Sequence, residues 1–209
     1  WTPHNHYSAI KQGIAQKDDL AFPVEVFSEA DCGPGMKLIY ELPLQESIVT
    51  LDDDVIYRRT LLEDLVLASE KNPGTIISDR IHRIALEEFG KMLPYISWVR
   101  EVTELLEPSP LNFLTGVGGV LYPPGSLHPD AFDIRLYEKL SRNTDDIWGV
   151  REAIRAGTEI ANTGKFQRLN YIHSTQETGL WQTGNREMND LVLNRLREIY
   201  DLHAVEKAD

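Results

Sequence analysis

Short apolar runs alternate with amphipathic segments along the middle of the chain. The run 47–51, Ser-Ile-Val-Thr-Leu, is β-branched and nearly all apolar, which is typical of a strand covered on both faces. Residues 59–71 carry apolar side chains at helical spacing before an Asn-Pro-Gly turn, and residues 75–78 form a second apolar run. Strand, turn, helix and strand in close succession predict an α/β layer with parallel strands and helical crossovers.

Weaker patterns extend this order in both directions. They predict a short strand at 24–27 and further helices at 36–42, 146–156 and 187–200. The sequence contains no internal repeat, low-complexity tract or linker. We therefore expect residues 1–209 to form a single domain, in which residues 1–23 are loop and short helix.

Composition contributes mainly by what it excludes. Lys and Arg total 21 against 33 Asp and Glu, a formal net charge of −12, which disfavours nucleic acid and anionic lipid as partners. No stretch approaches the roughly 18 apolar residues of a membrane span, and the start of the chain lacks the basic and apolar regions of a signal peptide. The single Cys32 is compatible with a reducing compartment. We expect a cytoplasmic protein without membrane insertion.

The acidic triplet Asp52, Asp53 and Asp54 directly follows the first predicted strand. Adjacent carboxylates repel one another unless a cation lies between them. Ligands of α/β sheets bind beyond the carboxyl ends of strands, where one or two carboxylates and substrate phosphates hold Mg²⁺ or Mn²⁺. In an extended segment Asp52 and Asp54 point the same way. The triplet predicts a divalent metal site, and the alternative is a solvated acidic turn that caps the helix starting near Arg59.

A second acidic pair, Asp145 and Asp146, stands at the start of a predicted helix. A carboxylate there either caps free amides or, if it faces a pocket, accepts a proton. The pair follows the glycine-rich segment 116–125 by about one helix length, so we expect both at the same edge of the sheet. The glycine-rich segment itself suits backbone packed tightly against a ligand or another strand.

Two single residues complete the candidates. His173 lies at the end of a short apolar run and is a candidate metal ligand, with a structural role as the alternative. Trp98, in the Pro-Tyr-Ile-Ser-Trp segment 94–98, suits stacking on a sugar or a base, with packing in the core as the alternative.

In this order the segments resemble the bacterial glycosyltransferase-like proteins related to family 2, which are associated with surface polysaccharide assembly. The matching residues are 31–38, 50–57, 94–98, 115–124, 145–148, Asn185 and 189–190. The resemblance covers roughly residues 24–200. Its most specific part is the combination of the acidic triplet with the Gly-Val-Gly-Gly-Val-Leu-Tyr-Pro-Pro run and the Asp-Asp-Ile-Trp box.

The resemblance implies an A-type glycosyltransferase fold, with a mostly parallel central sheet flanked by helices. Members of the family begin with a strand and an arginine-containing loop, which residues 1–23 do not match. On this interpretation residues 1–23 are atypical, and three explanations are open: the chain is a fragment without the first strand, residues 1–23 replace it in another way, or catalysis has been lost. The implied ligands are a nucleotide-sugar donor, with a UDP-sugar favoured, and Mn²⁺ or Mg²⁺.

The resemblance also implies roles for individual residues. Asp54 binds the metal, Asp52 lies near the donor ribose, and Asp146 is favoured over Asp145 as the general base. Lys37 approaches the diphosphate, unless it is a surface lysine on a helix. Asp53 is also expected in the donor site. The expected metal ligands besides Asp54 are Asp52 and His173. The expected substrate contacts are Gly118, Gly119, Tyr122, Trp98 and Trp148.

The resulting hypothesis is a metal-dependent, inverting, hexosyltransferase-like enzyme. It transfers a sugar from a nucleotide-sugar donor to a hydroxyl of a carbohydrate acceptor in surface polysaccharide or lipopolysaccharide assembly. One alternative is a truncated, non-catalytic sugar- or nucleotide-binding module of the same fold. Another is a metal-dependent phosphohydrolase of the haloacid dehalogenase type, whose motif requires Thr or Val where this chain has Ile56.

Overall fold

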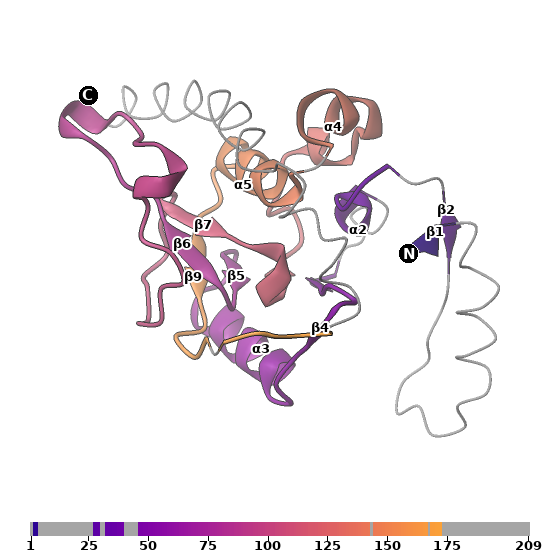
Figure 1. Ribbon diagram of the computed structural model, residues 1–209, viewed down its shortest axis with the longest axis horizontal. Coiled ribbons are helices and arrows are strands. Elements are labelled where there is room, and N and C mark those ends of the chain that lie inside the picture. The colour runs from indigo at the N-terminus through magenta and orange to yellow at the C-terminus, as the bar shows by residue number, and fades with distance from the viewer. Residues whose placement is uncertain are drawn as a thin grey trace.

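The computed structural model describes residues 2–3, 27–29, 32–39, 46–142, 144–166 and 168–172 (Figure 1). The helix expected at 187–200, His173 and all but the last residue of the strand expected at 24–27 lie outside these ranges. Within them the chain is a mixed α/β structure, as the sequence predicts.

A four-stranded sheet forms the centre of the described structure. Its strands are β3 (Ile48–Thr50), β5 (Ile76–Ser78), β8 (Val120–Tyr122) and β9 (Ile160–Asn162). Their order across the sheet is β3-β8-β5-β9. The pairs β3–β8 and β5–β8 are antiparallel, and only β5–β9 is parallel.

The prediction of a mostly parallel sheet is wrong for these strands, because β8 is antiparallel to both of its neighbours. A parallel return requires a long crossover, usually a helix. Between β5 and β8, where every residue is described, the chain has no α-helix. It passes through the antiparallel pair β6 (Ile81–Arg83) and β7 (Asn112–Leu114) and returns through the short 3₁₀ turn η3 (Gly116–Gly118).

Helices cover both faces of the sheet. Successive strand residues point to opposite sides, so neighbouring residues of one strand pack against different helices. Ile77 packs with Leu65 of α3 (Leu61–Lys71), whereas Ile76 belongs to the larger core that includes Val150 of α5 (Asp145–Arg155). Figure 1 shows the two helices on opposite sides of the strands. The helices expected at 59–71 and 146–156 are thus present as α3 and α5.

A third apolar cluster joins two further helices to α5. It consists of Ile39 in α2 (Met36–Ile39), Tyr137 in α4 (Ile134–Ser141) and Trp148. The Tyr137 hydroxyl accepts a hydrogen bond of 2.8 Å from the amide of Gly35, directly before α2. A Cβ atom at Gly35 would lie 2.4 Å from the Tyr137 ring, so glycine permits this close approach.

Short elements complete the described chain. They are β1 (Thr2–Pro3), β2 (Ser28–Glu29), β4 (Val55–Ile56), β10 (Asn170–Tyr171), η1 (Glu88–Gly90), η2 (Tyr95–Ser97) and η4 (Pro129–Phe132). Strand β10 pairs antiparallel with β4, so that Tyr171 lies opposite Val55. This pairing brings residues 170–172 beside the acidic triplet. Among the described residues, no helix has the length and apolarity needed to cross a membrane.

Helix α3 provides a matched test of the packing. Leu65 is completely buried, whereas Leu62 on the same helix is 57% exposed. We expect Leu65→Ala to lower the free energy of unfolding by about 2–5 kcal/mol, because it leaves a cavity beneath the sheet. Leu62→Ala should change it by less than about 0.5 kcal/mol. Urea unfolding of both variants tests this, and equal effects would contradict the placement of α3.

Candidate functional site

Lys37 lies between two carboxylates that come from distant parts of the sequence. Its Nζ is 2.6 Å from Oδ1 of Asp52, just after β3, and 2.9 Å from Oδ2 of Asp145, at the start of α5. The three side chains are only 16–28% exposed. One ammonium group therefore holds α2, the end of β3 and the start of α5 together.

Asp146 joins this cluster to the glycine-rich turn. Its Oδ1 accepts a hydrogen bond of 2.6 Å from the amide of Gly116. A Cβ atom at Gly116 would lie 2.9 Å from the Lys37 Nζ and 3.1 Å from the Asp146 Oδ1. A larger residue here would push on the ends of these two side chains, and the expected meeting of the glycine-rich segment with the 145–146 pair is observed.

The environment of the cluster shifts the pKa of one carboxyl group, that of Asp146, to near neutral pH. Burial, followed by the charge of Asp145, raises the pKa of Asp146 to about 7. Burial also raises the pKa of Asp52, although Lys37 acts in the opposite direction. For Lys37 burial alone would lower the pKa, but Asp145 and Asp52 outweigh it and raise the pKa. Asp146 is thus suited to take up and release a proton near pH 7.

Tyr57 is a member of the site that the sequence did not indicate. Its hydroxyl accepts a hydrogen bond of 2.8 Å from the amide of Asp52 and donates one of 3.1 Å to the carbonyl of Val117. Burial raises the pKa of Tyr57 to about 12, so the hydroxyl remains a donor. Tyr57 fixes the end of β3 against the glycine-rich turn. The feature of the sequence that could have indicated this role is a tyrosine five residues after Asp52.

The rest of the triplet differs from the extended segment that the sequence predicts. The chain turns at Asp53 and Asp54 before β4, so Asp52 and Asp54 are not alternate residues of one strand. The reason is the pairing with residues 170–172, in which the carbonyl of Asp54 accepts a bond of 2.9 Å from the amide of Ile172. Asp53 is exposed and Asp54 is half-buried.

Among the described residues, no group of three or more His, Cys, Asp and Glu side chains is arranged to hold a metal. Of the expected ligands, Asp52 is paired through Oδ1 with Lys37, and Asp54 lies on the turn that follows. Mg²⁺ and Mn²⁺ need only one or two carboxylates when substrate phosphates supply the rest. Thr50, close by on β3, has a buried hydroxyl without a hydrogen-bond partner in the described part. His173, the third expected ligand, lies outside the described residues.

The two tryptophans expected to contact substrate lie in the hydrophobic core. Trp98 is 4% exposed, packs against Phe113 and donates from Nε1 to the carbonyl of Leu93 at 3.0 Å. Trp148 is completely buried and donates from Nε1 to the carbonyl of Ala131 at 3.1 Å. Their polar atoms are therefore already satisfied by backbone carbonyls.

The remaining expected contacts lie along the turn from β7 to β8. A Cβ atom at Gly118 would lie 2.4 Å from that of Arg80, and Gly119 adopts a φ of +90° that favours glycine. Tyr122 is buried on β8, where burial raises its pKa and the charges of the Lys37 cluster also act on it. Gly118 thus packs against the backbone of Arg80, and Gly119 against the side chains of Leu51 and Leu61.

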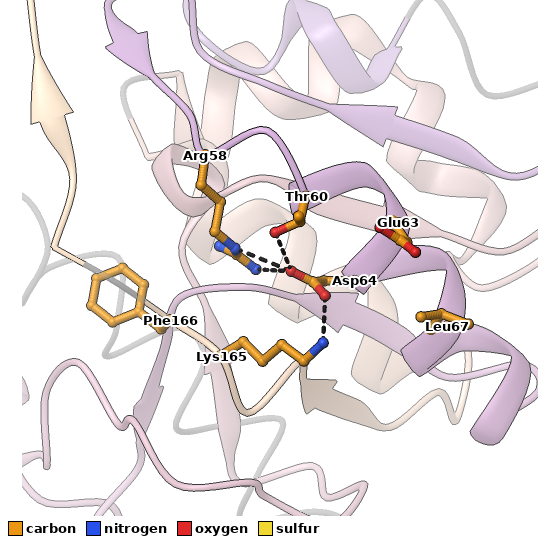
Figure 2. Close-up of a pocket in the computed structure, with 7 residues that line it drawn as sticks. All are labelled: Arg58, Thr60, Glu63, Asp64, Leu67, Lys165 and Phe166. Carbon is orange, nitrogen blue, oxygen red and sulfur yellow. Dashed lines mark hydrogen bonds and ion pairs between the residues drawn. The ribbon is translucent and has the colours of Figure 1, made fainter.

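A second cluster of charges lines a hollow of about 470 Å³ beside α3. Figure 2 shows Arg58, Thr60 and Lys165 all directed at the buried Asp64. Arg58 also pairs with the buried Asp79. Two cations therefore face two buried carboxylates, which makes this cluster a balanced structural network that ties α3 to the segment after β9.

Comparisons with protein-family models, curated proteins and solved structures found no match to this chain.

The raised pKa of Asp146 gives a prediction about stability. A carboxyl whose pKa is higher in the folded state destabilises the fold as pH rises from about 4 to about 7, because the unfolded chain releases the proton first. We expect Asp146→Asn to gain free energy of unfolding relative to the wild type between about pH 5 and about pH 8. Urea unfolding across this range tests it, with the exposed Asp53→Asn as a charge control. Parallel wild-type and Asp146→Asn profiles would contradict the assignment.

Proposed function

We propose that this protein is an inverting glycosyltransferase that moves a sugar from a nucleotide-sugar donor to a hydroxyl of a carbohydrate acceptor. The observation that carries the proposal is the meeting of Asp52, Asp145, Asp146 and the Gly116 amide around Lys37. These are the residues of three segments that resemble the family-2 glycosyltransferase-like proteins. The resemblance further suggests surface polysaccharide assembly in the cytoplasm as the setting.

Asp146 is the better candidate for the general base. Asp145 is held at 2.9 Å by the ammonium group of Lys37, so its carboxylate is already engaged in an ion pair. Asp146 instead accepts a hydrogen bond from a neutral amide, and burial raises its pKa to about 7. In the proposed reaction its carboxylate takes the proton of the acceptor hydroxyl as the hydroxyl oxygen attacks the anomeric carbon. The bond from that carbon to the diphosphate oxygen breaks.

The donor side of the site is formed by the acidic turn and Lys37. Asp54, with Asp52, would hold Mn²⁺ or Mg²⁺, and Asp53 lies on the exposed side of the same turn. When bound, the metal ion neutralises charge on the departing nucleoside diphosphate. Lys37 is not the surface lysine that the sequence left open, since it is largely buried between two carboxylates. It keeps Asp52 in place beside the donor.

One observation favours a second function, a non-catalytic module that binds a sugar or a nucleotide. Lys37 already neutralises Asp52 and Asp145 without a metal ion. Such an arrangement would also stabilise a fold that has kept binding and lost transfer. Binding and transfer must therefore be measured separately.

Donor binding tests the metal side of the site. Calorimetric titration with UDP and with GDP, each with and without Mn²⁺, should show binding that depends on the metal ion. We expect Asp54→Ala to weaken this binding about tenfold or more, because it removes a charged metal ligand. Glu70→Ala, an exposed change on α3, is the control. Binding by Asp54→Ala equal to that of the wild type would argue against the proposed metal site.

Transfer tests the base. With UDP-glucose, UDP-galactose and UDP-N-acetylglucosamine as donors and a panel of sugars as acceptors, we expect UDP release to rise with pH through about 7. Asp146→Asn should keep donor binding and lose about 10²–10⁴-fold in rate. An active Asp146→Asn variant would assign the base to another residue. Donor binding without transfer in the wild type, under every condition, would support the binding module.

A further inference from the structure

A larger hollow of about 640 Å³ lies beside the acidic turn. It is lined by Glu101, Thr103, Phe166, Arg168, Leu169 and Tyr171. The pairing of Tyr171 with Val55, and the bond from the Ile172 amide to Asp54, place one wall next to the turn. The charges of Asp54 and Asp52 also act on the Tyr171 hydroxyl. The hollow therefore borders the proposed donor site.

The opposite wall is held in a strained conformation. Glu101 has a φ of +53°, an uncommon value for a residue with a side chain, and such residues gather at ligand sites. Its carboxylate accepts a bond of 2.8 Å from Arg80, and its amide donates one of 3.1 Å to Nδ1 of His82. Burial lowers the pKa of His82 to about 4, so this nitrogen stays an acceptor at neutral pH.

Arg80 connects this wall to the proposed base. Its second terminal nitrogen donates to the hydroxyl of Thr115 at 3.0 Å. The next residue, Gly116, donates its amide to Asp146. A series of hydrogen bonds through Arg80, Thr115 and Gly116 thus links Glu101, at the hollow, to the group proposed to deprotonate the acceptor.

The chemistry of the lining differs from that of the hollow in Figure 2. There both cations are bound to carboxylates. Here Arg168 is exposed and has no ion pair within the described residues. Tyr171 is 39% exposed, so its ring is accessible together with Phe166 and the Thr103 hydroxyl. The lining carboxylate, Glu101, is paired with Arg80. An aromatic ring, a hydroxyl and an exposed guanidinium without an ion pair to any described residue match a sugar ring that carries an anionic group.

We propose that this hollow binds the acceptor, and that the acceptor is an anionic sugar, a hexose bearing a phosphate or a carboxylate. Arg168 pairs with the anionic group, and the ring of Tyr171 packs against the sugar. The assignment of the sugar as acceptor rests on the proposed function. The binding of the sugar in the hollow does not, and it can be measured without any donor.

Calorimetric titration of the full chain tests this with four probes: glucose 1-phosphate, glucuronate, glucose and inorganic phosphate. The anionic sugars should bind more tightly than glucose and more tightly than inorganic phosphate. Arg168→Gln should weaken both anionic sugars about tenfold or more and leave glucose unchanged. Tyr171→Ala should weaken all three sugars. Arg135→Gln, an exposed change on α4, is the matched control and should have no effect.

The outcomes separate this inference from the proposed function when UDP with Mn²⁺ is titrated into the same samples. Anionic sugars that bind no better than glucose, or equally well to wild type and Arg168→Gln, overturn the inference even if UDP binds. The inference is also overturned if inorganic phosphate binds as tightly as glucose 1-phosphate, because the site would then recognise only the anionic group and not the sugar. Anionic sugar binding without binding of either UDP or GDP, each titrated with Mn²⁺, retains the sugar site and overturns the glycosyltransferase proposal.

Discussion

The ion pairs of Lys37 are the interaction on which the described site depends. Asp52 and Asp145 are mostly buried, and two buried carboxylates close together are unstable without a cation between them. Because Lys37 comes from α2, the position of that short helix decides whether the carboxylates are neutralised. The helix is in turn fixed by the Tyr137 hydroxyl and the glycine before it. The contact of α4 with α2 thereby controls whether the two carboxylates are neutralised.

The sequence was sufficient to predict which segments meet and insufficient to predict how their charges are arranged. The glycine-rich segment and the acidic pair at a helix start were expected at one sheet edge, and the Gly116 amide does donate to Asp146. The partner of Asp52 could not be predicted, because the reach of the Lys37 side chain depends on the contact between Gly35 and Tyr137. The same holds for Tyr57, whose two bonds join residues 52 and 117.

Strand direction and the two hollows also depend on contacts between distant residues. The apolar run at 75–78 identified β5, but nothing local to β8 shows that it runs antiparallel to β5. That direction follows from the β6–β7 pair, which forms only when residues 81–83 meet 112–114. Likewise, Arg58 and Arg168 are both unremarkable in the sequence. Only the fold gives Arg58 two carboxylate partners and places Arg168 at a hollow.

The long sequence separation of the contact that seats α2 has a consequence for the order of folding. It joins residues 102 apart, farther than the strand pairs of the central sheet, such as Ile48 with Tyr122 and Ile76 with Ile160. Closing such long loops costs chain entropy before any contact repays it. We therefore expect the sheet and α3 to assemble first and the Lys37 ion pairs to close last, when α2 docks. In a refolding experiment the Gly35 amide, which donates to Tyr137, would be among the last to gain protection from hydrogen exchange.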